Sequence, residues 1–389
     1  MVCSRLIRHA NRIVATLLLV SLLTGVGASP VHADLGLSVM PGLIDLLATP
    51  GARGSQEIAI SNTGTEAFTA SVTIEAVPSA PVDRSAVGWL AASTDFVELE
   101  PGERETITIG IVVPEYMPSG GYYARISFTT LNANVAANSA ALAGQLSVGI
   151  LLTVEGDGDI TREGRITQFA PVLEADGRIG FRMQVVNDGN THLISPSGAV
   201  TVTLADGSPF GSLELPEMPP LLPGAEAMLV SQGSLPLTDG GDFRADATFT
   251  YQDGSEDGVT LTASATFTIS PELTLATASV CENLDRGPTL AVTLQNEGEL
   301  GLQPLVTLML ESDTGQALGT APVGGGLLLW PGEQERIAID FPERLVSGAY
   351  RLVTTVQFDP TAAPLVQETP FQIGGLGGAP APLCSAQSA

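Results

Sequence analysis

The chain has 389 residues, with 42 acidic side chains against 16 lysines and arginines, and a formal net charge of −26 at pH 7. Lysine is absent, so every one of those 16 is an arginine. So acidic a surface repels nucleic acids and anionic lipids, and both are excluded as expected partners. The length suits two or three domains.

The N-terminus has the pattern of a secretory signal peptide. Three arginines precede an apolar run, Ile13–Ala28, and Val31–Ala33 fits a small-x-small cleavage site. We therefore predict a signal peptide over residues 1–33 and a mature chain that begins at Asp34. A retained N-terminal anchor is the alternative. No transmembrane segment is predicted in the mature chain, which we expect in the periplasm, on the cell surface or outside the cell.

Three sequence marks recur in the same order along the mature chain. The first is an Asn-x-Gly turn: Asn62 and Gly64, Asn187 and Gly189, Asn296 and Gly298. The second is a Pro-Gly pair: Pro101 and Gly102, Pro223 and Gly224, Pro331 and Gly332. The third is an aromatic with a following arginine: Tyr123 and Arg125, Phe243 and Arg244, Tyr350 and Arg351. From the asparagine to the proline the gaps are 39, 36 and 35 residues, which predicts three homologous domains.

Each mark predicts a β-structure. Asn-x-Gly favours a turn after a strand, and Pro-Gly favours a type II turn. Alternating polar and apolar residues follow Pro101-Gly102, as expected of a strand with one buried face. The fold class is therefore all-β, with three tandem immunoglobulin-like β-sandwiches over 34–158, 159–270 and 271–376 and a flexible tail over 377–389. The aromatic of the third mark is expected at the sandwich corner, mostly buried at one equivalent position in each copy. We interpret it as a scaffold residue, with contact to a ligand as the alternative.

Two cysteines, Cys281 and Cys384, remain once the signal peptide is removed. In an exported chain an even pair favours a disulfide, with two free thiols as the alternative. Cys281 ends the expected first strand of the third domain, and Cys384 lies in the tail. In sandwiches of this type part of the first strand pairs with the last, so both strands are expected to finish at the same pole.

Candidate chemistry is sparse. His192 is the single histidine of the mature chain and is interpreted as a loop residue. Asp157 and Asp159 offer oxygen ligands for calcium, although Gly-Asp pairs are also ordinary linker chemistry. The hairpin tip Tyr251–Gly258 is a weaker metal candidate. Trp89 and Trp330 are interpreted as structural residues that lead into the Pro-Gly turns. We therefore predict no catalytic residue, no metal, no cofactor and no enzyme activity.

One insertion distinguishes the first copy. The uncharged segment Leu131–Gly144 replaces the shorter hairpin loops of the other two copies. Long loops in compact domains often carry function, and the alternative is a solvated hairpin tip.

The first copy, from Leu35 to about Gly156, resembles immunoglobulin-like domains of bacterial exported surface proteins. Its segments "LGLSVMPGLIDLLATPG", "FVELEPGERETITIGIVVP" and "GGYYARISF" are similar to the N-terminal domain of WxL-binding surface proteins and, more distantly, to periplasmic pilus chaperones. Pilus chaperones have two domains and hold a subunit's carboxylate with a basic pair, whereas this chain has three predicted domains and no matched pair. WxL-binding proteins carry a C-terminal anchor, and this chain ends in "GGLGGAPAPLCSAQSA".

These observations predict a non-enzymatic exported protein of the cell envelope or extracellular space. Its role would be structural, adhesive or protein-binding, with a protein or cell-wall partner. A periplasmic pilus-type assembly chaperone that acts by strand pairing is the alternative.

Overall fold

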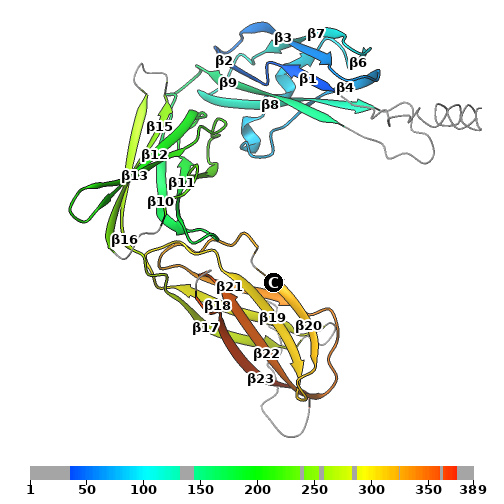
Figure 1. The fold of residues 1–389 in the computed structure, drawn as a ribbon. Helices are drawn as coiled ribbons and strands as arrows, with labels where there is room; N and C mark the ends of the chain where they lie inside the picture. The colour runs from blue at the N-terminus through cyan, green and yellow to red at the C-terminus, as the bar shows by residue number, and fades with distance from the viewer. Residues whose placement is uncertain are drawn as a thin grey trace, which may run out of the picture. The chain divides into compact units, whose positions relative to one another are not determined.

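The computed structural model describes residues 36–131, 144–236, 241–253, 258–282, 287–323, 325–359 and 362–374. These residues form strands β1 to β23 and two 3₁₀ helices of three residues each, η1 (Val82–Arg84) and η2 (Val87–Trp89) (Figure 1). Among the described residues no helix is long and apolar enough to cross a membrane. The fold is all-β and of the immunoglobulin-like sandwich type.

The first sandwich contains nine strands in two sheets. They are β1 (Leu37–Met40), β2 (Leu43–Ala48), β3 (Arg53–Asn62), β4 (Phe68–Glu75), β5 (Leu90–Ala92), β6 (Phe96–Leu99), β7 (Arg104–Val112), β8 (Gly120–Leu131) and β9 (Gln145–Val154). One sheet has the order β1-β3-β7-β5 and the other β2-β9-β8-β4-β6. The two N-terminal strands therefore belong to different sheets: β1 pairs with β3, whereas β2 lies beside β9.

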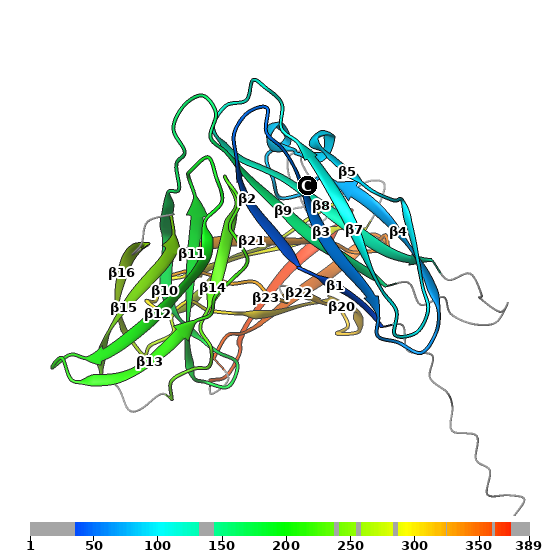
Figure 2. The same ribbon diagram turned by 90° about the horizontal axis from the view of Figure 1, so that it is seen from above.

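The second sandwich contains seven strands. They are β10 (Gly164–Leu173), β11 (Ile179–Asn187), β12 (Ile194–Leu204), β13 (Pro209–Leu215), β14 (Glu226–Val230), β15 (Asp242–Gln252) and β16 (Val259–Thr268). They form sheets of order β10-β11-β14 and β13-β12-β15-β16, which can be followed in Figure 2. The predicted last hairpin is confirmed, because β15 and β16 pair antiparallel from Asp242 opposite Thr268 to Tyr251 opposite Val259.

The third sandwich repeats the strand order of the second. Its strands are β17 (Leu273–Cys281), β18 (Thr289–Asn296), β19 (Leu305–Ser312), β20 (Ala317–Val323), β21 (Gln334–Asp340), β22 (Gly348–Gln357) and β23 (Leu365–Ile373). The sheets have the orders β17-β18-β21 and β20-β19-β22-β23. Among the described residues of this sandwich, β17 pairs with β18 and is the terminal strand of its sheet, so the expected pairing of the first strand with the last is not found there.

Alternation of side chains explains the cores. Along β15 the inward residues, among them Phe243, Ala247 and Phe249, are buried, whereas the residues between them are partly or fully exposed. Phe243 stacks on Phe267 of β16, with ring centroids 5.4 Å apart. A strand with a period of two therefore buries one face between the sheets and leaves the other in contact with water.

The described chain divides into two compact units. One holds the residues up to Val77, with Ser85–Tyr116 and Tyr123–Leu152, and the other holds Pro78–Arg84, Met117–Tyr122 and the residues from Thr153 onward. The second and third sandwiches thus belong to one unit. The sequence boundaries at 158/159 and 270/271 fall between β9 and β10 and between β16 and β17.

Candidate functional site

The asparagine of the first mark is buried in all three sandwiches. Asn187 shows the arrangement: its Nδ2 donates to the carbonyl oxygens of Thr191 (2.8 Å) and Leu221 (2.7 Å). Its Oδ1 accepts from Gly189 N (2.9 Å). The side chain is fully buried, and both its Nδ2 group and its Oδ1 atom have hydrogen-bond partners, as is usual for a buried polar group.

The same three contacts recur in the other two copies. Nδ2 of Asn62 donates to Glu66 and Leu99, and Nδ2 of Asn296 donates to Leu300 and Leu329. Their Oδ1 atoms accept from Gly64 N and Gly298 N. Because the second carbonyl always lies two residues before the proline of the second mark, the asparagine joins the two turns that the sequence marks identify. We call this arrangement the asparagine clamp.

Backbone bonds complete the clamp at the Pro-Gly turn. The N–H groups of Gly102, Gly224 and Gly332 donate to the carbonyl oxygens of Asn62, Asn187 and Asn296, at 2.8, 2.8 and 2.9 Å. All three glycines have positive φ, between 71° and 80°, a conformation that favours glycine over residues with a Cβ.

Two copies add a carboxylate to this turn. Glu333 Oε2 accepts from Trp330 N (2.8 Å), and Glu103 Oε2 accepts from Glu100 N (2.9 Å). Glu100 is therefore the counterpart of Trp330. Trp89 was expected to lead into the same turn and does not, because it lies in η2, with β5 and β6 between it and Pro101.

The corner aromatic of the first copy is Tyr122, not Tyr123. The hydroxyl of Tyr122 donates to Pro118 O (3.0 Å), and the hydroxyl of Tyr350 donates to Val346 O (2.7 Å), four residues back in both cases. Tyr123, the next residue along β8, is fully buried but lies on the opposite face of the strand. The sequence pattern assigned the corner to Tyr123, whereas the tyrosine in the position of Tyr350 is Tyr122.

Tyr122 also contacts a cation. The guanidinium of Arg84 lies over its ring, 5.1 Å from the centroid, and donates to Ser119 O. Burial raises the pKa of the Tyr122 hydroxyl, and the positive charge of Arg84 partly opposes that shift.

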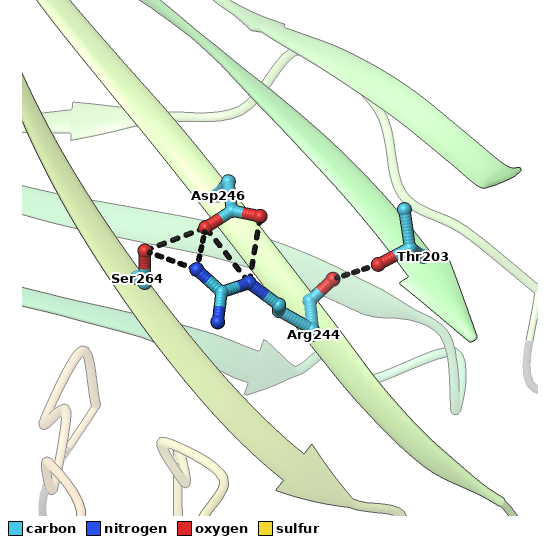
Figure 3. Close-up of polar contacts among 4 residues, drawn as sticks. All are labelled: Thr203, Arg244, Asp246 and Ser264. Carbon is cyan, nitrogen blue, oxygen red and sulfur yellow. Dashed lines mark hydrogen bonds and ion pairs between the residues drawn. The ribbon is translucent and has the colours of Figure 1, made fainter. Parts of the chain in front are cut away.

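The arginines of the third mark are paired with carboxylates on the outer sheet faces. In the second sandwich Arg244 and Asp246 project from β15, with Arg244 Nη2 2.7 Å from Asp246 Oδ1, and Ser264 of β16 joins them (Figure 3). The Arg244 and Ser264 hydrogen bonds lower the pKa of the Asp246 carboxyl. The backbone oxygen of Arg244 accepts from Thr203 Oγ1 on β12.

The other two arginines cross to a neighbouring strand. Arg125 lies 2.8 Å from Glu75 of β4, whose carboxylate also accepts from Ser127. Arg351 pairs with Glu311 of β19 and with Glu368 of β23 at 2.9 Å. All three guanidinium groups are thus neutralised by carboxylates of their own sandwich.

The remaining sequence candidates lie apart from one another. His192 lies in the loop after the Asn187 turn, as predicted, and its side chain is buried. Asp157 and Asp159 are exposed, and their backbone oxygens accept from Ser119 N and Asn190 Nδ2. Within the described ranges no group of three or more potential metal ligands is found. Most of the hairpin tip after Asp253 lies outside those ranges.

The inserted segment of the first copy is described only at its base. Thr130 N and Oγ1 donate to Gly144 O, and Gly144 N donates to Thr130 Oγ1. Residues 132–143 lie outside the described residues, as does Cys384. Cys281 ends β17, and its disulfide with Cys384 stays a prediction.

Strand β2 was not singled out from the sequence. It is the terminal strand of the five-stranded sheet and lies beside β9, where Gly149 N donates to Gly42 O (3.2 Å). Its outward leucines, Leu43 and Leu47, are 43% and 65% exposed. The segment "LIDLLA" already indicated exposed leucines, since alternate residues of a strand point to opposite faces and its leucines cannot all face one core.

Comparisons with known proteins find no family and only distant structural likenesses. No protein-family model matches the chain. No curated protein matches it either. Among solved structures, the class 5 fimbriae chaperone CfaA matches with 10% identity and a TM-score of 0.33, covering 58% of this chain and 98% of that one. The E. coli chaperone DraB has 10% identity and a TM-score of 0.33, with coverages of 59% and 98%. The Salmonella enterica SafB chaperone, solved with the SafA pilin, has the same identity and TM-score, with coverages of 59% and 96%. At 10% identity these likenesses concern the sandwich fold alone.

Proposed function

We propose that this chain is a non-enzymatic exported protein of the cell envelope or extracellular space, with a structural, adhesive or protein-binding role. The observation that carries the proposal is strand β2, a terminal strand with two outward leucines, Leu43 and Leu47. Open sheet edges with apolar side chains accept extended segments of other proteins. The partner class is therefore a protein that presents such a segment.

The recurring residues support a scaffold role for the rest of the chain. The asparagine clamp holds turns, and the arginines of the third mark are paired with carboxylates of their own sheets. Sites for chemistry need polar groups that are held in place yet open toward a substrate. The repeated asparagine amides and arginine guanidinium groups instead bind other groups of their own sandwich.

We also propose that the chain is exported and that its three sandwiches have the boundaries expected from the sequence. A signal peptide over 1–33 would direct the chain out of the cytoplasm, and sandwiches over 34–158, 159–270 and 271–376 would follow, with a tail over 377–389. The oxidising compartment would allow the Cys281–Cys384 disulfide to form.

A second candidate function is assembly of pili by strand pairing. The same β2 edge favours it, because a chaperone of this kind adds a strand between itself and a subunit. Since β2 already lies beside β9, the added strand would have to pair with β2 or displace it. A chaperone would bind one defined subunit in a one-to-one complex, whereas an adhesive array would bind a surface or several partners.

The test is recovery of partners from the native envelope by the mature chain, after fractionation has located it. The Leu43→Thr/Leu47→Thr variant keeps β-forming residues but removes the apolar edge. Phe96→Thr is the matched control, because Phe96 is 57% exposed on β6, the other terminal strand of the same sheet. The proposal predicts loss of the partner only with the leucine variant. Equal recovery by all three proteins, or a chain found only in the cytoplasm, would contradict it.

A further inference from the structure

Residues just after the clamp asparagine contact the segment that connects to the preceding sandwich. In the third sandwich one of these residues is Glu299, three positions after Asn296. Its Oε2 accepts from the backbone N of Thr268 (2.8 Å) and from Thr268 Oγ1 (3.3 Å). Thr268 is the last residue of β16, the final strand of the second sandwich. A side chain of one sandwich therefore binds the backbone end of another.

A second contact lies two residues further on. Gly301 N donates to Pro171 O (2.7 Å), and Gly301 O accepts from Leu173 N (3.0 Å). Gly301 is thus a single-residue parallel bridge to Val172, at the end of β10. Its neighbours Leu300 and Leu302 are fully buried, which anchors Gly301 to the third sandwich.

The position requires glycine. A Cβ on Gly301 would lie 2.8 Å from Val172 Cγ2 and 3.4 Å from Pro171 O. A residue with a Cβ at this position would therefore have to displace the buried Val172 side chain.

The second sandwich uses the corresponding residue in the same way. Asn190 stands three positions after Asn187, and its Oδ1 accepts from Thr161 N (2.8 Å) in the segment that leads into β10. Its Nδ2 donates to Asp159 O (2.7 Å). Asn190 and Glu299 differ chemically, but both present an oxygen to a backbone N–H of the incoming segment. In the first copy the position is occupied by Thr65, and the residues before Gly36 lie outside the described part of the chain.

We propose that the residue three positions after the clamp asparagine is a linker receptor in the second and third sandwiches, and that Glu299 with Gly301 joins these two sandwiches into one body. The joint consists of three backbone N–H groups, those of Thr268, Gly301 and Leu173, each with an acceptor across the junction. This inference goes beyond the proposed function, because it says which part of the array moves as a unit and is independent of what binds at β2.

The test is hydrogen exchange of the mature full-length chain, followed by mass spectrometry of peptides that cover 168–176, 266–272 and 298–304. A closed junction protects the three amides on the time scale of the neighbouring strands. Glu299→Ala should speed exchange at Thr268 by about tenfold or more, because the amide loses its acceptor. Glu299→Gln should restore protection, because an amide oxygen also accepts a hydrogen bond.

Two further variants complete the design. Gly301→Val should speed exchange in all three peptides, because its side chain pushes Val172 away. Glu297→Ala is the matched control: Glu297 is an exposed acid on the same turn that contacts the incoming segment through its backbone N–H, to Glu272 O. Amides of β18 and β19 report in each variant whether the third sandwich is still folded. Exchange of the three junction amides at unfolded-chain rates in the unaltered protein, with β18 and β19 protected, would overturn the inference. So would equal effects of Glu299→Ala and Glu297→Ala.

Discussion

Asn296 offers the sharpest test of the asparagine clamp, because a fluorescent probe lies beside it. Trp330 is 9% exposed and directly follows Leu329, whose carbonyl accepts from Asn296 Nδ2 at 3.0 Å. Asn296→Ala removes this bond, the bond to Leu300 O (2.7 Å) and the bond from Gly298 N (3.1 Å).

The size of the loss follows from what is left behind. Leu329 O keeps a partner, because Leu302 N donates to it at 2.9 Å. The groups Leu300 O and Gly298 N lose the asparagine contact. Leu300 is fully buried, and a buried polar group left unpaired costs about 1–3 kcal/mol, whereas Gly298 is only partly buried and its N–H can bind water. We therefore expect a loss of about 1–3 kcal/mol, against a domain stability of about 5–15 kcal/mol.

The assay is urea unfolding followed by Trp330 fluorescence in a Trp89→Phe background. With an m-value of about 2 kcal/mol/M, a loss of about 2 kcal/mol moves the midpoint down by about 1 M. Gln295→Ala is the matched control, because this side-chain amide precedes Asn296 on β18, points to the opposite face and is partly exposed. A change below about 0.5 kcal/mol in Asn296→Ala, the level of ordinary surface substitutions, would refute the reasoning. An equal loss in the control would do the same.

Four further outcomes are expected. Thr354→Val should raise the free energy of unfolding by about 1 kcal/mol, because the buried Thr354 hydroxyl has no hydrogen-bond partner among the described residues; a lower urea midpoint would contradict this. The Asp246 pKa is lowered from 3.8, so its contribution to the free energy of unfolding is complete above pH 3.8 and is lost as the pH falls through the folded-state pKa. The free energy of unfolding of Asp246→Asn should therefore fall less steeply with pH in that range. Replacing residues 132–143 by Asn-Gly should change the free energy of unfolding by less than about 1 kcal/mol, and a large drop in melting temperature would place the segment in the core. Non-reducing peptide mapping of the exported protein should recover Cys281 linked to Cys384, and two free thiols would exclude the bond.

The fold was readable from the sequence because turns and alternation are local. Asn187, Gly189 and Gly224 are needed for backbone reasons, so their spacing repeats wherever the sandwich repeats. The all-β class and the final hairpin followed directly. The sequence did not reveal that the first two marks are joined in a clamp, because the hydrogen bond from Asn187 to Leu221 spans 34 residues.

Side-chain partners were less predictable for the same reason. Arg125 meets Glu75 across 50 residues of sequence, and its glutamate has no fixed offset that the other copies share. Arg351 likewise pairs with carboxylates on two different strands, whereas Arg244 pairs two residues away on its own. The choice between Tyr122 and Tyr123 depended on a hydrogen bond to Pro118 O, which sequence spacing alone does not reveal.

The three copies divide their residues between two tasks, and the division explains which positions repeat. Among the described residues, the side-chain hydrogen bonds of the clamp asparagine stay within its own sandwich, so the same side chain serves in every copy. Three positions later the residue is Thr65, Asn190 or Glu299, and in the last two copies it meets the incoming segment, which differs at each junction. Positions that face inward therefore repeat, because the fold repeats, and positions that face a neighbour diverge with that neighbour. By this reasoning the exposed leucines of β2, which have no counterpart in the marks shared by the three copies, would belong to the second group, in keeping with the proposed protein partner.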